Sequence, residues 1–509
     1  MVMPLLMALA AAQPADCAGL AGVVAAVKGA VVDQAAAVPP DWQASGGKAV
    51  WGGYAPVPVR AGFCRVQGRI EGTIGFEMWL PADWNGRLLG AGVGGDAGVF
   101  NYRDMSLRIA QGFAVVTTDS GHKASDPHWM ANAKARVDYE HRAVHLATVA
   151  AKALVHQYYA RPVEKSYYLG CSGGGRQALK EMQTRPGYDG GDYDGVVAGA
   201  PGPYMPLQSV RMEYFAVEQA RHPEAMLGDA DWALYERASF EACDGIDGVK
   251  DGVVENPLAC RFRPATLLCK PGQADGCLTA PKLAMLERII APMPDEQGRP
   301  MDRGLLPGVR TRPGPPSPLL NAMWADAVHG DPNWDAQTFR RSADLAAINR
   351  VMPNLRADST DIGAFLHHGG KAILYQGWQD PSTNAGPTIA WYRALARSHP
   401  QVDRSVRLFM VPGMYHCRGG PGADAFGGSG DATASGRADS DILWALIDWV
   451  EQGRVPRRLT ATRWEKEKPV FTRVLCPFPQ RAVYDGQGDT AQAASFACRR
   501  DDTLARLLR

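Results

Sequence analysis

A serine in a Gly-x-Ser-x-Gly frame has a cysteine beside it, and a histidine far downstream has one as well. The first group is Gly170-Cys171-Ser172-Gly173-Gly174, and the second is His416-Cys417. A disulfide between these two cysteines would hold a serine loop against a histidine loop, because the bond requires the two backbones to lie only a few ångströms apart. If the bond forms, it limits the chain to folds in which these two distant segments meet.

Length and charge narrow the class of protein. The 509 residues exceed the size at which single cores stop growing, so we expect one large core with an insertion, or two domains. The net charge of +1 gives no reason to expect a nucleic acid or a membrane as partner. Residues 1–12 are apolar and end in small residues, which is typical of a signal peptide and too short to span a bilayer, so we take 1–16 as its remnant. We expect a secreted or periplasmic protein.

The chain has ten cysteines, and none of them forms a Cys-x-x-Cys pair. This favours five disulfides over a zinc site or a redox motif, which agrees with export. Short spacings suggest the pairs Cys243–Cys260, Cys269–Cys277 and Cys476–Cys498. Cys17–Cys64 would fasten the N-terminal region, which leaves Cys171 and Cys417, but spacing alone does not fix the connectivity.

Apolar, β-branched runs bounded by turn residues predict strands before residue 204 and after residue 367. The predicted strands are 74–80, 87–92, 113–118, 166–169, 196–200, 372–375 and 407–411, with a helix over 139–158. Strands that alternate with helices favour a mostly parallel sheet covered on both faces. The alternation stops over 204–367, which we interpret as an insertion between core segments 17–203 and 368–509. An insertion at the carboxyl ends of the strands would cover the site there as a lid.

The context of Ser172 indicates a nucleophile. Residues 166–169 read as a strand and 176–183 as a helix, so the glycine-rich turn between them matches a nucleophile elbow. A serine needs a base, and an acid that orients the base. Asp380 and His416 follow the ends of two successive predicted strands, in the order Ser, Asp, His. Their rivals are His367 and His368 for the base, and Asp326 and Asp361 for the acid.

An oxyanion formed at this serine would need two backbone N–H donors. One should come from Gly173, directly after the serine. The other should come from the glycine loop 92–98, where Gly94 and Gly95 are equally suitable. This loop lacks the spacing and the lysine of a phosphate-binding loop.

A run of carboxylates and glycines in the predicted insertion is suited to a hard cation. It offers the side chains of Asp244, Asp247 and Asp251 and the carbonyls of Val249 and Val253. The spacing is not that of an EF-hand, and Cys243 and Cys260 flank the run. We expect a structural Ca²⁺ here and no organic cofactor; the alternative is a solvated acidic turn.

Further motifs extend along nearly the whole chain, at 92–98, 118–122, 138–145, 170–177, 243–253, 377–381, 416–417, 473–477, 484–486 and 496–498. With these motifs the chain resembles the tannase and feruloyl esterase family, which includes the bacterial hydrolase of monohydroxyethyl terephthalate. The resemblance implies an α/β-hydrolase fold with a large inserted lid domain and a triad of Ser172, His416 and Asp380. It also implies a Cys171–Cys417 disulfide and calcium bound by Asp244, Asp247, Val249, Asp251 and Val253. Members can carry a larger residue where this chain has Gly173.

The resemblance further implies a serine carboxylic ester hydrolase that acts through an acyl-enzyme on small esters of aromatic acids. The acid could be of the feruloyl (hydroxycinnamoyl), galloyl or terephthalate monoester type. Ring stacking could come from Trp324, Trp334 or Phe339, or these residues could pack within the lid. Arg340, Arg341 or Arg350 could pair with a substrate carboxylate, although a surface role is common for arginine. The alternatives are a general lipase, esterase or peptidase, and a non-catalytic binding protein on the same scaffold.

Overall fold

The computed structural model of the protein describes residues 16–23, 27–44, 57–185, 187–311 and 318–508. The apolar stretch 1–12, on which the signal peptide was predicted, lies outside these residues. In the described ranges, no helix is long and apolar enough to cross a membrane.

The centre of the protein is one nine-stranded sheet, with strands in the order β1-β4-β5-β7-β6-β8-β9-β10-β11. The first three strands and β7 pair antiparallel, and the strands from β7 onward pair parallel. Their bounds are β1 Ala30–Val38, β4 Phe63–Ile70, β5 Ile74–Pro81, β6 Arg87–Ala91, β7 Ala114–Thr118, β8 Lys165–Cys171, β9 Gly195–Gly199, β10 Lys371–Gly377 and β11 Val406–Val411. The protein therefore has a mixed α/β fold with a largely parallel sheet.

Helices cover both faces of the sheet. Successive side chains of a strand point to opposite faces, so each strand contributes apolar side chains to two cores. On one face, Tyr167 and Leu169 of β8 pack in the same core as α1 (Tyr102–Ile109) and α12 (Ile442–Gln452). On the other face, Tyr168 packs with α4 (Gly173–Met182) and α11 (Ala385–Ser398). On that second face, α3 (Ala143–Tyr159) packs against β4 to β7. Since both faces are covered, the parallel strands are buried over most of their length.

All seven predicted strands are present, each displaced by no more than a residue or two at its ends. The single helix predicted over 139–158 is different: it begins as a π-helical turn, Asp138–Arg142, and continues as α3. The helix predicted over 176–183 begins earlier, because α4 starts at Gly173. Strands β1 and β4 were not predicted, since they lie at the antiparallel edge, where polar residues interrupt the apolar run.

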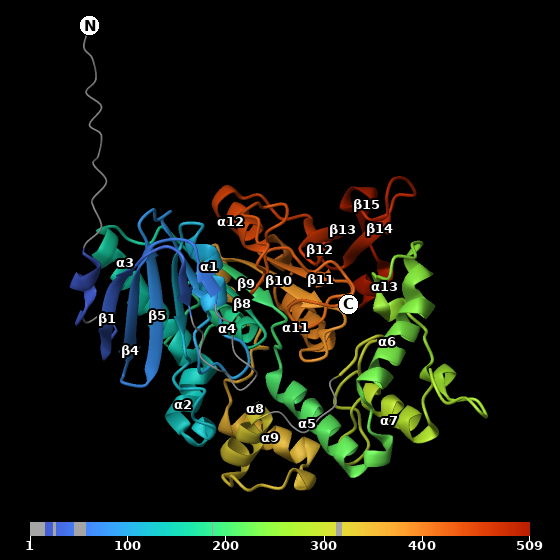
Figure 1. Ribbon diagram of the computed structural model, residues 1–509. Helices are drawn as coiled ribbons and strands as arrows, with labels where there is room; N and C mark the ends of the chain where they lie inside the picture. The colour runs from blue at the N-terminus through green and yellow to red at the C-terminus, as the bar shows by residue number, and fades with distance from the viewer. Residues whose placement is uncertain (1–15, 24–26, 45–56, 186, 312–317, 509) are drawn as a thin grey trace.

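The segment between β9 and β10 is mainly helical and lies below and to the right of the sheet in Figure 1, in green and yellow. Its helices are α5 Met205–Arg221, α6 Asp229–Cys243, α7 Ala280–Ile290, α8 Pro318–Asn321, the π helix Ala322–His329, α9 Arg341–Val351 and α10 Gly363–His367. The segment has an apolar core that also takes in Val93 and Trp129 from the loops after β6 and β7. Glu213 of α5 is fully buried in it, and burial, with repulsion from Asp344, raises the pKa of Glu213 to about 7.

Short strand pairs and five disulfides complete the described part of the chain. The pairs are β2 Trp42–Ala44 with β3 Val57–Val59, β12 Leu459–Glu465 with β13 Lys468–Leu475, and β14 Gln480–Tyr484 with β15 Phe496–Arg500. The remaining α-helices of the described residues are α2 Ala133–Val137 and α13 Asp502–Arg506. The disulfides are Cys17–Cys64, Cys171–Cys417, Cys243–Cys260, Cys269–Cys277 and Cys476–Cys498. The expected pairing is therefore confirmed, and five disulfides fit an oxidising compartment.

Candidate active site

Ser172 lies on a sharp turn between a strand and a helix. It follows the last residue of β8 and precedes the first residue of α4, with φ 61° and ψ −123°. A positive φ costs a non-glycine residue of order 1–3 kcal/mol, so the surrounding structure must hold it in place. Two main-chain hydrogen bonds do so: the N–H of Ser172 donates to the carbonyl of Gly199 (3.0 Å), and the N–H of Arg176 donates to the carbonyl of Ser172 (2.8 Å).

The glycines around Ser172 are required by close backbone approach. A Cβ at Gly170 would lie 2.5 Å from the carbonyl oxygen of Gly174, and a Cβ at Gly175 would lie 2.1 Å from that of Gly199. Both distances are well below van der Waals contact. Since α4 packs directly on β8 and β9, only a chain with these glycines can place Ser172 at the carboxyl edge of the sheet.

The three glycines predicted to line an oxyanion site lie in two adjoining loops. A Cβ at Gly173 would lie 2.6 Å from the carbonyl oxygen of Gly95, and a Cβ at Gly94 would lie 3.9 Å from that of Cys171. The N–H of Gly92 also donates to Leu169 (2.9 Å), which joins the glycine loop to β8. The first N–H groups of a helix have no partner within it, so α4 directs free donors toward this edge. In this chain, a larger residue at position 173 would collide with the glycine loop.

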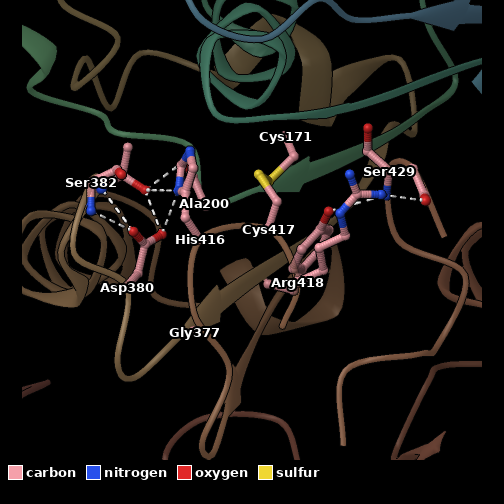
Figure 2. The surroundings of a disulfide bond; sticks show 12 residues. Cys171, Ala200, Gly377, Asp380, Ser382, His416, Cys417, Arg418 and Ser429 are labelled. Carbon is pink, nitrogen blue, oxygen red and sulfur yellow. Dashed lines mark hydrogen bonds and ion pairs between the residues drawn. A yellow bond between two sulfur atoms is a disulfide. The ribbon is translucent and has the colours of Figure 1, made fainter. Parts of the chain in front are cut away.

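The predicted acid and base are in contact. Nδ1 of His416 lies 2.9 Å from Oδ2 of Asp380 (Figure 2). They follow β11 and β10, which are parallel neighbours, so both loops leave the sheet at the same edge. The side chain of Asp380 is fully buried, whereas about a quarter of that of His416 is exposed (27%). A buried carboxylate bonded to one ring nitrogen fixes the orientation of the imidazole and the tautomer it adopts.

Asp380 sits in a cradle of donors that sequence analysis missed. Its Oδ1 accepts from the N–H groups of Ser382 (2.8 Å) and Thr383 (2.9 Å). Its Oδ2 accepts from the hydroxyl of Thr383 (2.8 Å) and the amide of Gln376 (3.1 Å), in addition to its contact with His416. These hydrogen bonds satisfy oxygens that burial removes from water, and they fix the orientation of the carboxylate. The Asp-Pro-Ser-Thr pattern, typical of a side chain that caps the turn after it, could have revealed this cradle.

The disulfide Cys171–Cys417 joins the two loops across a sequence separation of 246, with the Cα atoms 6.0 Å apart. In Figure 2, His416 lies between Asp380 and this disulfide. Cys417 has φ 64°, and Ser172, the neighbour of Cys171, has φ 61°. The disulfide therefore joins two loops that each hold a non-glycine residue at positive φ. Ser172 and His416 are each bonded directly to one of the linked cysteines.

The rival residues lie elsewhere. His368 is 3.5 Å from Asp189, and its neighbour His367 ends α10. Asp326 pairs with His128 at 3.1 Å, and the exposed Asp361 accepts a main-chain hydrogen bond from Thr184. No rival takes part in the contacts around Asp380 and His416 that the described residues show.

The aromatic residues expected to stack on a substrate, or else to pack within the insertion, do pack there. Trp324 is fully buried, with its ring 5.2 Å from that of Phe339, and Trp334 stacks on His329 at 4.9 Å. Among the three arginines, Arg341 lies over Tyr214 and 3.9 Å from Glu296, the main-chain N–H of Arg340 donates to Asp344, and Arg350 is exposed. These contacts make the aromatic residues part of the core of the insertion.

The acidic run has donors of the right chemistry for a hard cation. Oδ1 of Asp244 accepts from Asp251 and Gly252, and Oδ1 of Asp247 accepts from Val249. Nearby Glu255, which sequence analysis missed, is buried, and Oε1 has no hydrogen-bond partner among the described residues. Burial raises the pKa of Glu255 to about 8, against the effect of Arg473 and with the help of the carboxylates of Asp247 and Asp251.

The carboxylates of the same run already have some hydrogen-bond and ion-pair partners within the protein. Asp251 pairs with Arg473 of β13, and burial raises the pKa of both Asp247 and Asp251. In the part of the chain that the structure describes, no three acidic, histidine or cysteine side chains converge as a metal site would require. The chemistry of the donors and the repulsion among them therefore fit a cation, while their present arrangement does not yet form its coordination shell.

Comparison with known proteins gives consistent matches over most of the chain. The family model for tannase and feruloyl esterase matches residues 59–306 and 316–499. An uncharacterized esterase from Xanthomonas campestris is 33% identical over 86% of this chain and 84% of that protein. Feruloyl esterase C from Talaromyces stipitatus is 32% identical over 86% of each protein. The crystal structure of feruloyl esterase B from Aspergillus oryzae has a TM-score of 0.85 at 28% identity, over 93% of this chain and 97% of that one.

Proposed function

The chain belongs to the tannase and feruloyl esterase family of ester hydrolases, and we propose that it acts through an acyl-enzyme formed on Ser172. His416 takes the proton of the serine hydroxyl as Oγ attacks the ester carbonyl. Asp380 holds the imidazole in the tautomer that presents its other nitrogen to the serine, and stabilises the cation that forms. The N–H groups of Gly173 and of Gly94 or Gly95 stabilise the oxyanion.

The two halves of the reaction use the same groups. Collapse of the tetrahedral intermediate breaks the ester bond, and His416 gives its proton to the departing alcohol. A water then attacks the acyl-enzyme, His416 takes the proton of that water, and the acid leaves as Ser172 regains its hydrogen. No redox partner or organic cofactor is needed for either half.

The observation that carries this proposal is the disulfide between the neighbours of Ser172 and His416, together with the 2.9 Å contact between His416 and Asp380. A covalent link between two loops separated by 246 positions keeps the serine and the histidine close together, as a nucleophile and its base must be. A turn without a catalytic role would not need such a link. The strand order supports an α/β-hydrolase core, with the helical insertion as its lid. The five disulfides support export to an oxidising compartment.

The substrate we propose is an ester of an aromatic acid. The experiment is a steady-state comparison of methyl ferulate, methyl gallate, monohydroxyethyl terephthalate and p-nitrophenyl butyrate, with Ser172→Ala as the blank. We expect a preference of tenfold or more for one aromatic ester, and no turnover by the variant. Activity confined to the butyrate would favour a general esterase, and full activity of Ser172→Ala would exclude the triad. Failure of a serine-reactive phosphonate to label Ser172 would favour a non-catalytic binding protein.

We also propose that the acidic run binds a structural Ca²⁺ through Asp244, Asp247 and Asp251 and the carbonyls of Val249 and Val253. The support is the crowding of carboxylates around Glu255 and the Cys243–Cys260 disulfide that brackets the run. An ion bound only by the folded state stabilises it, so a chelator should lower the melting temperature and added Ca²⁺ should restore it. A melting temperature that responds to neither treatment would favour a solvated acidic turn.

A further inference from the structure

The glycine loop 92–98, which carries one of the two proposed oxyanion donors, is held in place by hydrogen bonds to its backbone. Glycine has no side chain to pack, so a segment rich in glycine depends on such bonds for a single conformation. At the start of the loop, the side chain of Asn101 donates to the carbonyl of Gly92 (2.6 Å). The N–H of Val93 donates to Oε1 of Gln177 (3.1 Å). The first two residues are therefore fastened to the core.

The next two residues, Gly94 and Gly95, have N–H groups for which the described residues provide no acceptor. Free main-chain donors of this kind are what an oxyanion requires. The carbonyl of Gly94 accepts the N–H of Ala97 (3.1 Å) within the loop, so this bond does not fasten the loop to the rest of the protein. The carbonyl of Gly95 reaches outside the loop instead, and it accepts the hydroxyl of Tyr139 at 3.0 Å. This bond fixes the direction of the backbone beside the two free N–H groups.

Tyr139 has the properties needed to hold this carbonyl. Its side chain is only 2% exposed, and burial raises the pKa of Tyr139, so the hydroxyl keeps its proton and can donate it. The same oxygen lies 4.0 Å from Sδ of Met205, but a thioether sulfur is a weak acceptor and the hydroxyl has a single proton. The carbonyl of Gly95 therefore receives the hydrogen bond.

The π-helical turn Asp138–Arg142, which carries Tyr139, is fastened to the turn of the proposed nucleophile. The buried guanidinium of Arg176 donates to two main-chain carbonyls of the π turn (2.8 and 2.9 Å) and lies 4.7 Å from the centre of the Tyr139 ring. The N–H of Arg176 donates to the carbonyl of Ser172 (2.8 Å). Single π turns are uncommon and are found frequently at functional sites. This π turn links the nucleophile turn to the glycine loop.

We propose that Tyr139 is a positioning residue for ester hydrolysis, whose hydroxyl holds the glycine loop so that the N–H of Gly94 or Gly95 points at the oxyanion. The proposal rests on the proposed function, since an oxyanion forms only if Ser172 attacks an ester. Tyr139 acts through the loop and does not itself touch the substrate. Oxyanion donors act on charge that develops in the transition state, so a displaced donor lowers kcat and kcat/KM together.

The experiment removes only the hydroxyl and compares two tyrosines. Tyr139→Phe keeps the ring and its contact with Arg176, and it should lower kcat/KM on p-nitrophenyl butyrate by about 10- to 100-fold, less than the loss of a whole donor would. The matched control is Tyr159→Phe, because the buried Tyr159 also donates to a main-chain carbonyl, that of Pro81 (2.6 Å). Pro81 ends β5, which is antiparallel to β7, so this bond lies at the opposite edge of the sheet from Ser172. Both variants should lower the melting temperature alike, whereas Tyr159→Phe should keep the native kcat/KM.

A transition-state analogue gives a readout that a loss of folded protein does not change. Propyl trifluoromethyl ketone has the same acyl chain as the butyrate ester. Oγ of Ser172 forms a bond to its carbonyl carbon, the proton of the hydroxyl passes to His416, and the carbonyl oxygen becomes an oxyanion. The inhibition constant should rise in Tyr139→Phe by the factor by which kcat/KM falls. A purely structural role of Tyr139 would lower the amount of active enzyme and leave the inhibition constant unchanged.

Hydrogen exchange separates this proposal from the proposed function, because it requires no turnover. Mass spectrometry should show faster exchange of the amides of residues 92–98 in Tyr139→Phe than in Tyr159→Phe. If the native protein hydrolyses esters through Ser172, an unchanged kcat/KM or inhibition constant in Tyr139→Phe would overturn the proposal and leave the function in place. Equal losses of activity in the two variants, or equal exchange, would also overturn it. If Ser172→Ala is as active as the native protein, or neither hydrolyses an ester, the proposed function fails, and the exchange of the loop alone decides whether Tyr139 holds it.

Discussion

Removal of the Cys171–Cys417 disulfide should cost both stability and activity, and the two losses can be separated. The bond closes a loop of 246 positions, for which loop-closure entropy predicts a loss of about 5 kcal/mol in the free energy of unfolding. The double variant Cys171→Ser/Cys417→Ser also frees two loops whose residues Ser172 and Cys417 have positive φ. A misplacement of reacting groups by about 1 Å lowers a rate by about 100-fold, so we expect kcat to fall by at least that factor.

The control is the disulfide between Cys17 and Cys64, which lies in the core formed by β1, β4 and α3. Its separation of 47 predicts a similar loss of about 4 kcal/mol. The matched variant Cys17→Ser/Cys64→Ser should therefore be destabilised almost as much and yet keep its kcat. Unfolding would be followed by circular dichroism in urea, and kcat on p-nitrophenyl butyrate at a temperature where both variants stay folded.

Two results would refute this reasoning. If the Cys171/Cys417 variant keeps its kcat while folded, the bond does not hold the nucleophile and base in register. If both variants lose activity equally, the loss follows from general destabilisation, and the position of the bond beside the site has no catalytic meaning.

Three further predictions test the neighbouring contacts. Asp380→Asn keeps an acceptor for the turn N–H groups but no longer fixes the imidazole tautomer, so kcat should fall about 10⁴-fold with little change in the unfolding curve. Gly173→Ala places a Cβ 2.6 Å from the Gly95 carbonyl oxygen, so it should lower the free energy of unfolding by about 1–3 kcal/mol and remove most of the activity. The control Gly363→Ala, whose Cβ meets open space, should be neutral. Equal effects of the two variants would refute the close approach at Gly173. The pKa of Glu213 rises to about 7 from 4.5, so the folded state holds its proton longer and stability should fall as pH rises through that window. Glu213→Gln should remove this slope in urea unfolding measured from pH 4.5 to 8, and be more stable than the native protein above pH 7 by at most about 3 kcal/mol; an unchanged slope would contradict the shift.

The parallel strands could be predicted because burial on both faces requires a continuous run of apolar residues, which is visible in the sequence. A strand covered on both faces is mostly apolar, as β9, residues 114–116 of β7 and residues 372–375 of β10 show. Strands β1 and β4, at the antiparallel end of the sheet, contain solvent-facing residues among their buried ones and were missed. The positions of Ser172, Asp380 and His416 at strand ends followed from the same pattern, because parallel strands share one carboxyl edge.

The insertion could not be predicted in the same way. Its aromatic residues lie at positions that suit either a substrate pocket or a core, and spacing along the chain does not distinguish them. Trp324, Trp334 and Phe339 are in contact with one another or with their neighbours inside the insertion. Composition predicts that such rings will be buried, but whether protein or ligand buries them depends on contacts between segments far apart in sequence.

The groups missed around the site differ in how far their partners lie along the chain. Ser382, Thr383 and Gln376 hold Asp380 from within seven positions of one another, so a local turn pattern contained that information. Glu255 and Arg473, by contrast, lie far apart along the chain and meet only in three dimensions. The proposed triad can thus be inferred from strand ends and local turns, whereas a buried acid whose partner lies on a distant segment becomes visible only in the structure.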